Sequence, residues 1–176
     1  FIESSNENIH PVSLETIVAA QKLKGDTNGE IHAILFNKEL IPSLSSYNLD
    51  SIININDEKL NNYNPLYFLE AIKQINDKIN PDIILFGHTY QTRDWVPRLS
   101  AKLNIPFISD CIELDYTDKL YLMRPIFQAK LIQKISLTSN KAIISFQAGS
   151  FSSDDISKGS ATLNEESVDL SNVKET

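Results

Sequence analysis

The segment DIILF at residues 82–86, apolar without interruption after its first residue, constrains the fold more than any other feature of this sequence. Alternating polar and apolar residues are typical of a strand with one wet face, whereas a continuous run indicates a strand buried on both faces. The segment before it, Pro65–Ile79, repeats apolar residues at helical spacing and carries its proline at the start. A helix that leads directly into a doubly buried strand predicts a parallel sheet covered by helices.

The same alternation extends along residues 1–151. Besides Pro65–Ile79, we expect helices over 13–23, 41–47 and 94–103, and strands over 30–36, 51–55, 82–86 and from residue 106 onward. The short connections predict an α/β domain, built as a three-layer sandwich with a mainly parallel, Rossmann-like sheet. Residues 120–127, 131–137 and 141–146 follow with only turns between them, which predicts antiparallel strands at the C-terminal end of the domain.

The two ends of the chain differ from this body. Phe1 and Ile2 have the character of the last residues of a strand whose beginning is missing, so we draw nothing on targeting from them. Residues 152–176 contain six acidic, two basic and six serine residues and no aromatic residue. Such a segment buries too little apolar surface to offset its ordering entropy, so we predict a linker or tail without a fold of its own. The alternative is that its few apolar side chains dock on a partner: Leu163, Val168, Leu170 and Val173.

Composition excludes several classes of function. The net charge of −7 and the pI of about 4.9 argue against a broad basic face for nucleic acid. No apolar run approaches the ~18 residues that a membrane-spanning helix needs. The single cysteine, Cys111, rules out an internal disulfide, and the three histidines have no second ligand at metal spacing. A cytosol-like compartment is the default for such a chain.

Polar residues follow the DIILF strand and lead into the next helix, at the sheet edge where α/β proteins usually bind ligands. Backbone N–H groups at a helix start attract anions, so Thr89, Arg93 and Asp94 are the candidate anion-site residues. Because proline is tolerated only near a helix start, Pro97 predicts a start close to Asp94, whose simplest role is an N-cap. His88 is expected to be an ordinary loop residue, with a base or ligand as the alternative.

Other charged or reactive side chains favour structural roles. We expect Arg98 to pair with Asp110 and so to fix the helix to the next strand end. Cys111 has the character of a small core residue rather than a nucleophile, because no base lies near it in the sequence. Arg124, alone in an apolar strand, needs a buried or interface partner. The sequence contains no GxGxxG, GxxxxGKS/T, GxSxG or HExxH pattern, and we predict no catalytic or metal-binding residue.

Three stretches add a family resemblance. They are HPVSLETIVAAQKL, RDWVPRLSAKLNIPFISDCIELD, and MRPIFQAKLIQKI followed by SFQAGSF. In this order and spacing they resemble the N-terminal domain of the electron transfer flavoprotein alpha subunit, over nearly all of residues 1–151. The chain departs from the family pattern at four positions: Thr92 stands where Gly is usual, Ala129 and Lys130 replace a Gly-Asn pair, and Gln147 replaces Arg. These changes alter backbone freedom and charge near partner contacts, while the expected fold is unaffected.

The resemblance implies an adenine-nucleotide-alpha-hydrolase-like scaffold that pairs with a beta subunit in a heterodimer. FAD in the full-length protein would be held mainly by a C-terminal domain absent from this chain, and we expect no cofactor on the chain itself. The heterodimer would carry electrons from acyl-CoA or other dehydrogenases, as in fatty acid β-oxidation, to a quinone reductase or similar acceptor, without being a catalyst. Its compartment would be the cytoplasm of a bacterium or the mitochondrial matrix of a eukaryote.

Three residues are expected at the contact with the beta subunit: Arg124, Phe127 and Phe146. Apolar strands added to a sheet expose apolar surface to water unless another protein covers it, and a partner subunit would do so.

Two other classes of function stay open. One is a stand-alone nucleotide-binding module of the same superfold, which would use the edge around Thr89 for a phosphate. The other is an enzyme that acts on an activated carboxylate or a nucleotide. Modules of the first kind usually carry a Gly-rich phosphate loop, and here a single glycine, Gly87, precedes HTYQTRD.

Overall fold

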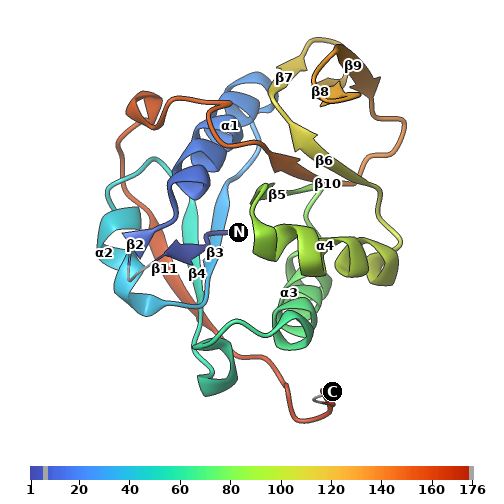
Figure 1. Ribbon diagram of the computed structural model, residues 1–176. Coiled ribbons are helices and arrows are strands. Elements are labelled where there is room, and N and C mark those ends of the chain that lie inside the picture. The colour runs from blue at the N-terminus through green and yellow to red at the C-terminus, as the bar shows by residue number, and fades with distance from the viewer. Residues whose placement is uncertain (6–7, 175–176) are drawn as a thin grey trace.

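The computed structural model describes residues 1–5 and 8–174 (Figure 1). Its helices are α1 (Pro11–Thr27), α2 (Ile41–Leu44), α3 (Pro65–Ile79) and α4 (Tyr90–Leu103), with single 3-10 turns η1 (Lys38–Leu40), η2 (Glu58–Leu60) and η3 (Ser153–Asp155). Its strands are β1 (Ser4–Ser5), β2 (Asn8–Ile9), β3 (His32–Leu35), β4 (Ser51–Ile55), β5 (Ile83–Gly87), β6 (Phe107–Cys111), β7 (Glu113–Tyr116), β8 (Leu120–Ile126), β9 (Leu131–Ser136), β10 (Ala142–Phe146) and β11 (Thr162–Glu166).

Two parallel three-stranded sheets form the middle layer of the fold. Their strand orders are β11-β4-β3 and β5-β10-β6. Phe1 and Ile2 lie between them: the amino group of Phe1 donates to the carbonyl of Leu85 in β5 (2.8 Å), and the N–H of Ile2 donates to the carbonyl of Ile34 in β3 (2.8 Å). These two hydrogen bonds join the sheets into one layer, and an antiparallel sheet, β7-β8-β9, lies beside β6.

Helices cover both faces of this layer, which confirms the predicted three-layer α/β sandwich. Helix α1 packs on β5 and β7, while α3 and α4 pack against each other on the opposite face (Figure 1). Successive residues of a strand point to opposite faces, so Ile143 of β10 joins the core under α3 and α4, and Ile144 joins the core under α1. In the first of these cores the indole of Trp95 stands edge-on to Phe86, with ring centroids 5.3 Å apart.

Local sequence signals define the ends of the long helices. The side chain of Asn64 accepts hydrogen bonds from two N–H groups at the start of α3, and Pro65 takes the first helical position, where an N–H is not needed. Asn28, Asn80 and Asn104 end α1, α3 and α4 in the left-handed conformation, with φ of 56°, 53° and 54°. Asparagine enters this region more readily than other residues with a side chain, so each helix stops at its own local signal.

Helix α4 begins earlier than the sequence predicted. Thr89 is its N-cap and Pro97 lies inside it, so the predicted start near Asp94 is wrong. Proline inside a helix removes the hydrogen bond to the carbonyl four residues earlier and its ring crowds that carbonyl, and Pro97 lies on the exposed side of the helix. Packing of the opposite face stabilises the helix across the proline. That face buries Trp95, Val96 and Leu99.

Strand β10 corrects the prediction for residues 141–146. We expected an antiparallel strand, but β10 runs parallel between β5 and β6. All five residues of β10 are buried, as expected for a central strand covered on both faces. The apolar run DIILF predicted the neighbouring strand for the same reason. The antiparallel addition therefore consists of β7, β8 and β9, and β7 was not predicted.

The described part of residues 152–176 is also ordered, contrary to the prediction of a tail without a fold of its own. Strand β11 pairs in parallel with β4 along five residues. Lys78 of α3 pairs with Glu166 at 2.8 Å, and Leu170 is buried among the side chains of the α3 core. Val168 and Val173 pack on the same core. The sparse apolar residues thus dock on the chain itself, and an acidic strand is stabilised at the sheet edge by pairing and by one lysine.

The turn between β8 and β9 carries backbone strain that can be measured. Phe127, Gln128 and Ala129 all adopt a positive φ, at 50°, 57° and 62°. Residues with a Cβ are strained there by ~1 kcal/mol or more each, whereas glycine is not. Ala129→Gly should therefore raise the free energy of unfolding by roughly 0.5–1 kcal/mol, measured by chemical denaturation.

The matched control is Lys130→Gly. Lys130 does not adopt a positive φ, so glycine at this position only adds freedom to the unfolded chain and should lower stability slightly. Equal effects of the two substitutions would contradict the assignment of strain to Ala129.

Candidate functional site

Polar side chains from three neighbouring strands meet at the carboxyl edge of the parallel sheet. His88 follows β5, Ser145 lies in β10 and Asp110 lies in β6. The Nδ1 atom of His88 lies 2.9 Å from the hydroxyl of Ser145, and that hydroxyl accepts the backbone N–H of Asp110 at 3.2 Å. The N–H of His88 donates to the carbonyl of Phe146 (2.7 Å). This network, which we call the edge cluster, ties the ends of β5, β10 and β6 together.

The edge cluster has the composition of a serine–histidine–aspartate triad but not its geometry. Ser145 is fully buried, so its hydroxyl cannot reach a substrate. The Nε2 atom of His88 lies 3.7 Å from Asp110 Oδ1, beyond hydrogen-bonding distance. In a working triad, one ring nitrogen of the histidine is hydrogen-bonded to the serine hydroxyl and the other is hydrogen-bonded to the carboxylate. The arrangement therefore serves to cross-link strands.

The surroundings of His88 favour its neutral form. Burial lowers the pKa of the imidazole below its ordinary 6.5, and the positive charges of Arg93 and Arg124 act in the same direction. The carboxylate of Asp110 opposes them without reversing the shift. A neutral imidazole suits the contact with the serine hydroxyl, because one ring nitrogen then carries a free lone pair.

Asp110 is the most strained residue of the edge cluster. Its φ is 62°, in the left-handed region, and the pairing of β10 with β6 shifts register beside it. This bulge turns the carboxylate toward His88. The predicted ion pair between Arg98 and Asp110 is therefore wrong: Arg98 pairs instead with Asp94, one helical turn away on α4, at 3.2 Å.

The three candidate anion-site residues point to different neighbours. Thr89 caps α4, and its hydroxyl donates to the carboxylate of Glu3 at 2.7 Å. Arg93 is exposed and its guanidinium lies over the ring of Tyr90, 5.5 Å from the centroid. Asp94 is a mid-helix residue that accepts the hydroxyl proton of Tyr63 (2.6 Å). A shared role in binding an anion stays a prediction, since each side chain is already engaged within the chain.

Glu3 is the residue at this edge that sequence reasoning missed. Burial raises the pKa of its carboxyl group, while the hydrogen bond from Thr89 and the charge of His10 work against that rise. The carboxyl group lies at the start of α4, where the helix dipole favours negative charge. Ser145 was missed as well, although a serine inside the apolar run AIISF was a visible signal.

Arg124 and Cys111 lie next to the edge cluster. Arg124 belongs to β8, and its buried Nε atom has no hydrogen-bond partner. The positive charge of Arg124 acts to lower the pKa of both His88 and the Cys111 thiol. Cys111 is fully buried and burial raises its pKa to about 12, so the thiol stays protonated. This position agrees with the predicted core role and provides no nucleophile.

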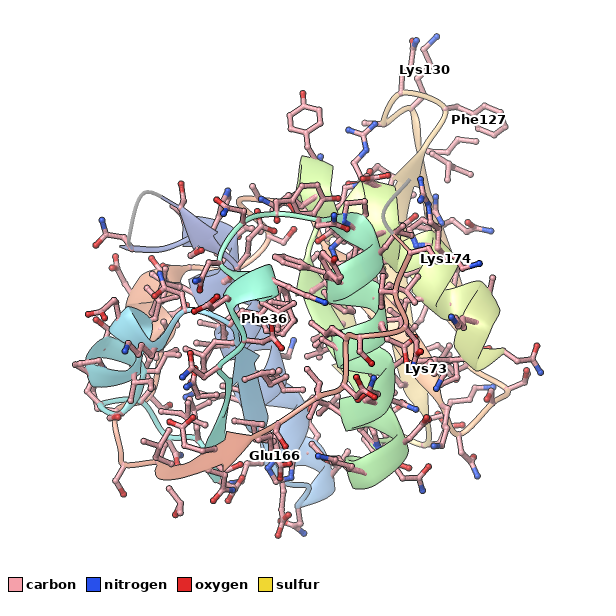
Figure 2. All side chains as sticks on the ribbon, turned by 90° about the horizontal axis from the view of Figure 1, so that it is seen from below. Phe36, Lys73, Phe127, Lys130, Glu166 and Lys174 are labelled. Atoms are coloured by element: carbon pink, nitrogen blue, oxygen red, sulfur yellow. The ribbon has the colours of Figure 1, made fainter. Side chains whose placement is uncertain are left out.

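The other two expected interface residues differ in exposure. Phe127 is 73% exposed at the tip of the β8–β9 hairpin, and Figure 2 shows it pointing away from the body together with Lys130. Phe146 is fully buried and stands edge-on to Phe151, with ring centroids 5.1 Å apart. Because β10 is a central strand, the side chain of Phe146 belongs to the core and cannot make the expected partner contact.

Two kinds of feature are absent from residues 1–5 and 8–174. In that part of the chain, no group of three or more His, Cys, Asp or Glu side chains is placed to hold a metal ion. No described helix combines the length and apolar character that crossing a membrane requires.

The edge cluster predicts a specific loss of stability in acid. Because burial lowers the pKa of His88, the stability contributed by its neutral ring is complete above pH 6.5 and is lost as the pH falls below that value. His88→Gln keeps a polar contact to Ser145 but cannot take up a proton. The variant should therefore lose less stability than the unmodified chain between about pH 7 and about pH 5 in urea denaturation.

His32→Gln is the matched control, since Nδ1 of His32 also contacts a serine hydroxyl, that of Ser51, at 2.8 Å. If His88→Gln and the unmodified chain show the same acid dependence, His88 does not carry the effect.

Comparison of the sequence with known proteins identifies a family for this chain. A family model described as the electron transfer flavoprotein domain matches residues 1–171. The electron transfer flavoprotein alpha subunit of Bacillus subtilis is 28% identical over 140 residues, covering 77% of this chain and 42% of the relative. The alpha subunit of Syntrophomonas wolfei is 29% identical over 154 residues, covering 85% of this chain and 47% of the relative.

A further relative is named as a subunit of a lactate dehydrogenase. Subunit LctC of the NAD(+)- and ferredoxin-dependent lactate dehydrogenase of Acetobacterium woodii is 24% identical over 140 residues, covering 77% of this chain and 34% of the relative. The chain thus spans less than half the length of each of these three relatives. With a family model matched along residues 1–171, the chain belongs to the electron transfer flavoprotein domain family.

Proposed function

We propose that this chain is the scaffold and interaction domain of an electron transfer flavoprotein alpha-type subunit. It pairs with a beta-type subunit in a heterodimer that carries electrons between a dehydrogenase and an acceptor such as a quinone reductase. The observation that carries the proposal is the family match along residues 1–171, supported by relatives named as alpha subunits. The chain itself positions its partners and performs no chemical step.

The geometry of the edge cluster supports a scaffold rather than a catalyst. Its serine is buried, its histidine is held neutral by burial, and its cysteine is a core thiol. The start of α4, where a nucleotide phosphate would bind, is already bonded through Thr89 to the carboxylate of Glu3. No described feature favours the stand-alone nucleotide-binding module over the scaffold.

The partner contact lies, in this proposal, on the β8–β9 hairpin. Its tip exposes three large apolar side chains, with exposed fractions of 73% for Phe127, 56% for Leu131 and 54% for Ile132. Exposed apolar side chains gathered on a projecting hairpin are typical of a surface that another protein covers. Arg124 lies on the same hairpin and is half-buried, so in this proposal its charge pairs with an acidic group across the interface.

The hairpin can be tested with the full-length alpha-type subunit and its cognate beta-type subunit. Phe127→Ser combined with Ile132→Ser should weaken the heterodimer at least ~10-fold in a titration, because each buried apolar side chain contributes ~1.5–3 kcal/mol and ~1.4 kcal/mol is one factor of ten. Both side chains are exposed in the chain alone, so its thermal midpoint should change little.

Leu163→Ser is the control for this experiment. Leu163 is 46% exposed, but it lies on β11 at the opposite edge of the parallel sheet (Figure 1). Unchanged affinity for both variants would place the beta-subunit contact elsewhere. Arg124→Ala adds a second readout, and full affinity of that variant would remove Arg124 from the interface.

We further propose that FAD in the full-length protein is held mainly by a separate domain. A loop that holds a pyrophosphate normally presents several backbone N–H groups, with glycines that let the backbone approach closely. The loop after Gly87 has the large side chains of Tyr90 and Gln91 at these positions. The chain of residues 1–176 should therefore be colourless when purified. Adding FAD should change neither flavin fluorescence nor the thermal midpoint.

The positive control is the full-length subunit, which should bind FAD under the same conditions. A yellow preparation of the 176-residue chain with stoichiometric FAD would overturn the proposal and move the flavin site to the edge around His88.

A further inference from the structure

Strand β9 (Leu131–Ser136) leaves one of its two sides open. It lies at the end of the antiparallel sheet β7-β8-β9, and within the residues that the structure describes it pairs with β8 alone (Figure 1). Its register with β8 continues without a bulge along the whole strand, and all of its residues except Ile135 are exposed. An edge strand of this length presents a row of backbone donors and acceptors to which another strand can add.

The hydrogen bonds of the hairpin show which residues of β9 face β8. Along an antiparallel pair, residues that exchange hydrogen bonds with the partner strand alternate with residues that do not. The N–H of Leu137 donates to the carbonyl of Leu120 at 3.3 Å, in the register of the β8–β9 ladder. Counted back in steps of two, Gln133 and Ile135 direct their backbone groups to β8 as well.

The intervening residues, Ile132, Lys134 and Ser136, therefore direct their N–H and C=O groups to the open side. Pro125 provides an independent check, because it has no N–H and stands opposite Ile132 in the ladder. A proline is compatible with that position when the pair exchanges no hydrogen bonds. Three residues of β9 thus offer one free donor and one free acceptor each.

The open side of β9 lacks the features that normally prevent strand addition. Edge strands are commonly protected by proline, by a bulge or by several charged side chains. Strand β11, at the edge of the parallel sheet, follows this rule with the adjacent charges of Glu165 and Glu166. Strand β9, with the sequence LIQKIS, has no proline, no bulge and a single charge, that of Lys134. It is therefore the edge of this molecule most open to pairing.

Charge indicates what kind of strand fits this edge. Residues 127–137 contain Lys130 and Lys134 and no acidic residue. A second copy of β9 would bring no carboxylate, and pairing about a two-fold axis through Lys134 would set two like charges opposite each other. The side chains of Ile132 and Lys134 lie on the same face of the sheet, since they are two residues apart. A strand with an acidic residue opposite Lys134 and an apolar residue opposite Ile132 complements both.

We propose that the open side of β9 receives a strand of the beta-type subunit, which extends the sheet β7-β8-β9 by one strand. This inference rests on the heterodimer proposed above and adds how the contact is made, namely through the backbone of Ile132, Lys134 and Ser136. The exposed ring of Phe127 lies at the tip of the same hairpin and packs on the same partner. In this mode of recognition the backbone hydrogen bonds supply affinity and the side chains supply specificity.

The first test measures hydrogen exchange of single amides in the full-length alpha-type subunit, with and without its cognate beta-type subunit. Binding should slow exchange at Ile132, Lys134 and Ser136 by about tenfold or more, because their N–H groups gain acceptors. Gln133 and Ile135 are the internal reference, since β8 protects their amides already in the free subunit. Unchanged exchange at the three outward amides, in a heterodimer that does form, would overturn the strand addition and leave the proposed function standing.

The second test replaces Lys134 and measures heterodimer affinity and thermal midpoint. Lys134→Pro removes one outward N–H, and proline is tolerated on an edge strand where the N–H faces solvent. Lys134→Thr is the matched control, because it loses the same charge and the same contact of the ammonium group with the Tyr121 ring but keeps the N–H. Lys134→Pro should bind the beta-type subunit about tenfold or more weakly than Lys134→Thr, as expected for a lost hydrogen bond and a blocked edge.

The thermal midpoint checks the orientation of β9 in the free alpha-type subunit. Lys134→Pro and Lys134→Thr should have similar midpoints, because β8 does not use the N–H of Lys134. Gln133→Pro should lower the midpoint, because it removes an N–H that faces β8. A larger loss for Lys134→Pro than for Gln133→Pro would reverse the assigned orientation and so contradict the proposal.

The remaining outcomes separate this inference from the function on which it rests. Equal affinities of Lys134→Pro and Lys134→Thr, with weakened binding of the Phe127→Ser, Ile132→Ser variant, would mean that the hairpin contacts its partner through side chains alone. Outward amides that become protected as the concentration of the alpha-type subunit rises, without any beta-type subunit, would assign the edge to a second copy of this chain. Either result contradicts strand addition by the beta-type subunit. Unmodified subunits that do not associate at all would contradict the proposed function itself.

Discussion

The placement of β10 between β5 and β6 is the interaction on which the rest of the structure depends. Its five residues are all buried, and it forms parallel ladders on both sides with strands that are far away in the sequence. The chain can reach this position only after it has left β6, formed the antiparallel sheet β7-β8-β9 and returned. The projecting hairpin is therefore a consequence of the crossover into the centre of the sheet. Ser145 is brought between His88 and Asp110 by the same pairing.

This arrangement separates stability from interaction. The buried edge cluster links three strand ends, and its polar atoms are largely used inside the chain. Three exposed apolar side chains, Phe127, Leu131 and Ile132, instead lie at the hairpin tip, where the strained backbone also occurs. Strain and exposed apolar surface are unfavourable for an isolated chain and are retained where a surface has a function. A domain whose interior polar groups are paired and whose exposed apolar side chains lie on one hairpin agrees with the scaffold role proposed above.

Where sequence reasoning succeeded, the signal was local. The helical period and the initial proline of residues 65–79 predicted that helix correctly, because both signals act within a few residues. It failed at Pro97, where burial of Trp95 and its neighbours outweighed the local preference of proline for a helix start. It also failed for the acidic C-terminal segment, whose strand pairs with β4, about 110 residues earlier in the chain. Pairing partners at such distances leave no periodic trace in a single sequence.

The sequence by itself determined the fold class, the helices with strong periodicity, the doubly buried strands and the family resemblance, because these depend on residue types at short spacing. Only the tertiary structure decided which strands are neighbours and whether they run parallel. It therefore also decided that Asp110 faces His88 rather than Arg98, that Phe146 is a core residue, and that Phe127 is exposed. The physical reason is that an apolar strand can bury the same side chains beside any of several neighbouring strands. The choice among them is made by the packing of the whole layer, which no short segment contains.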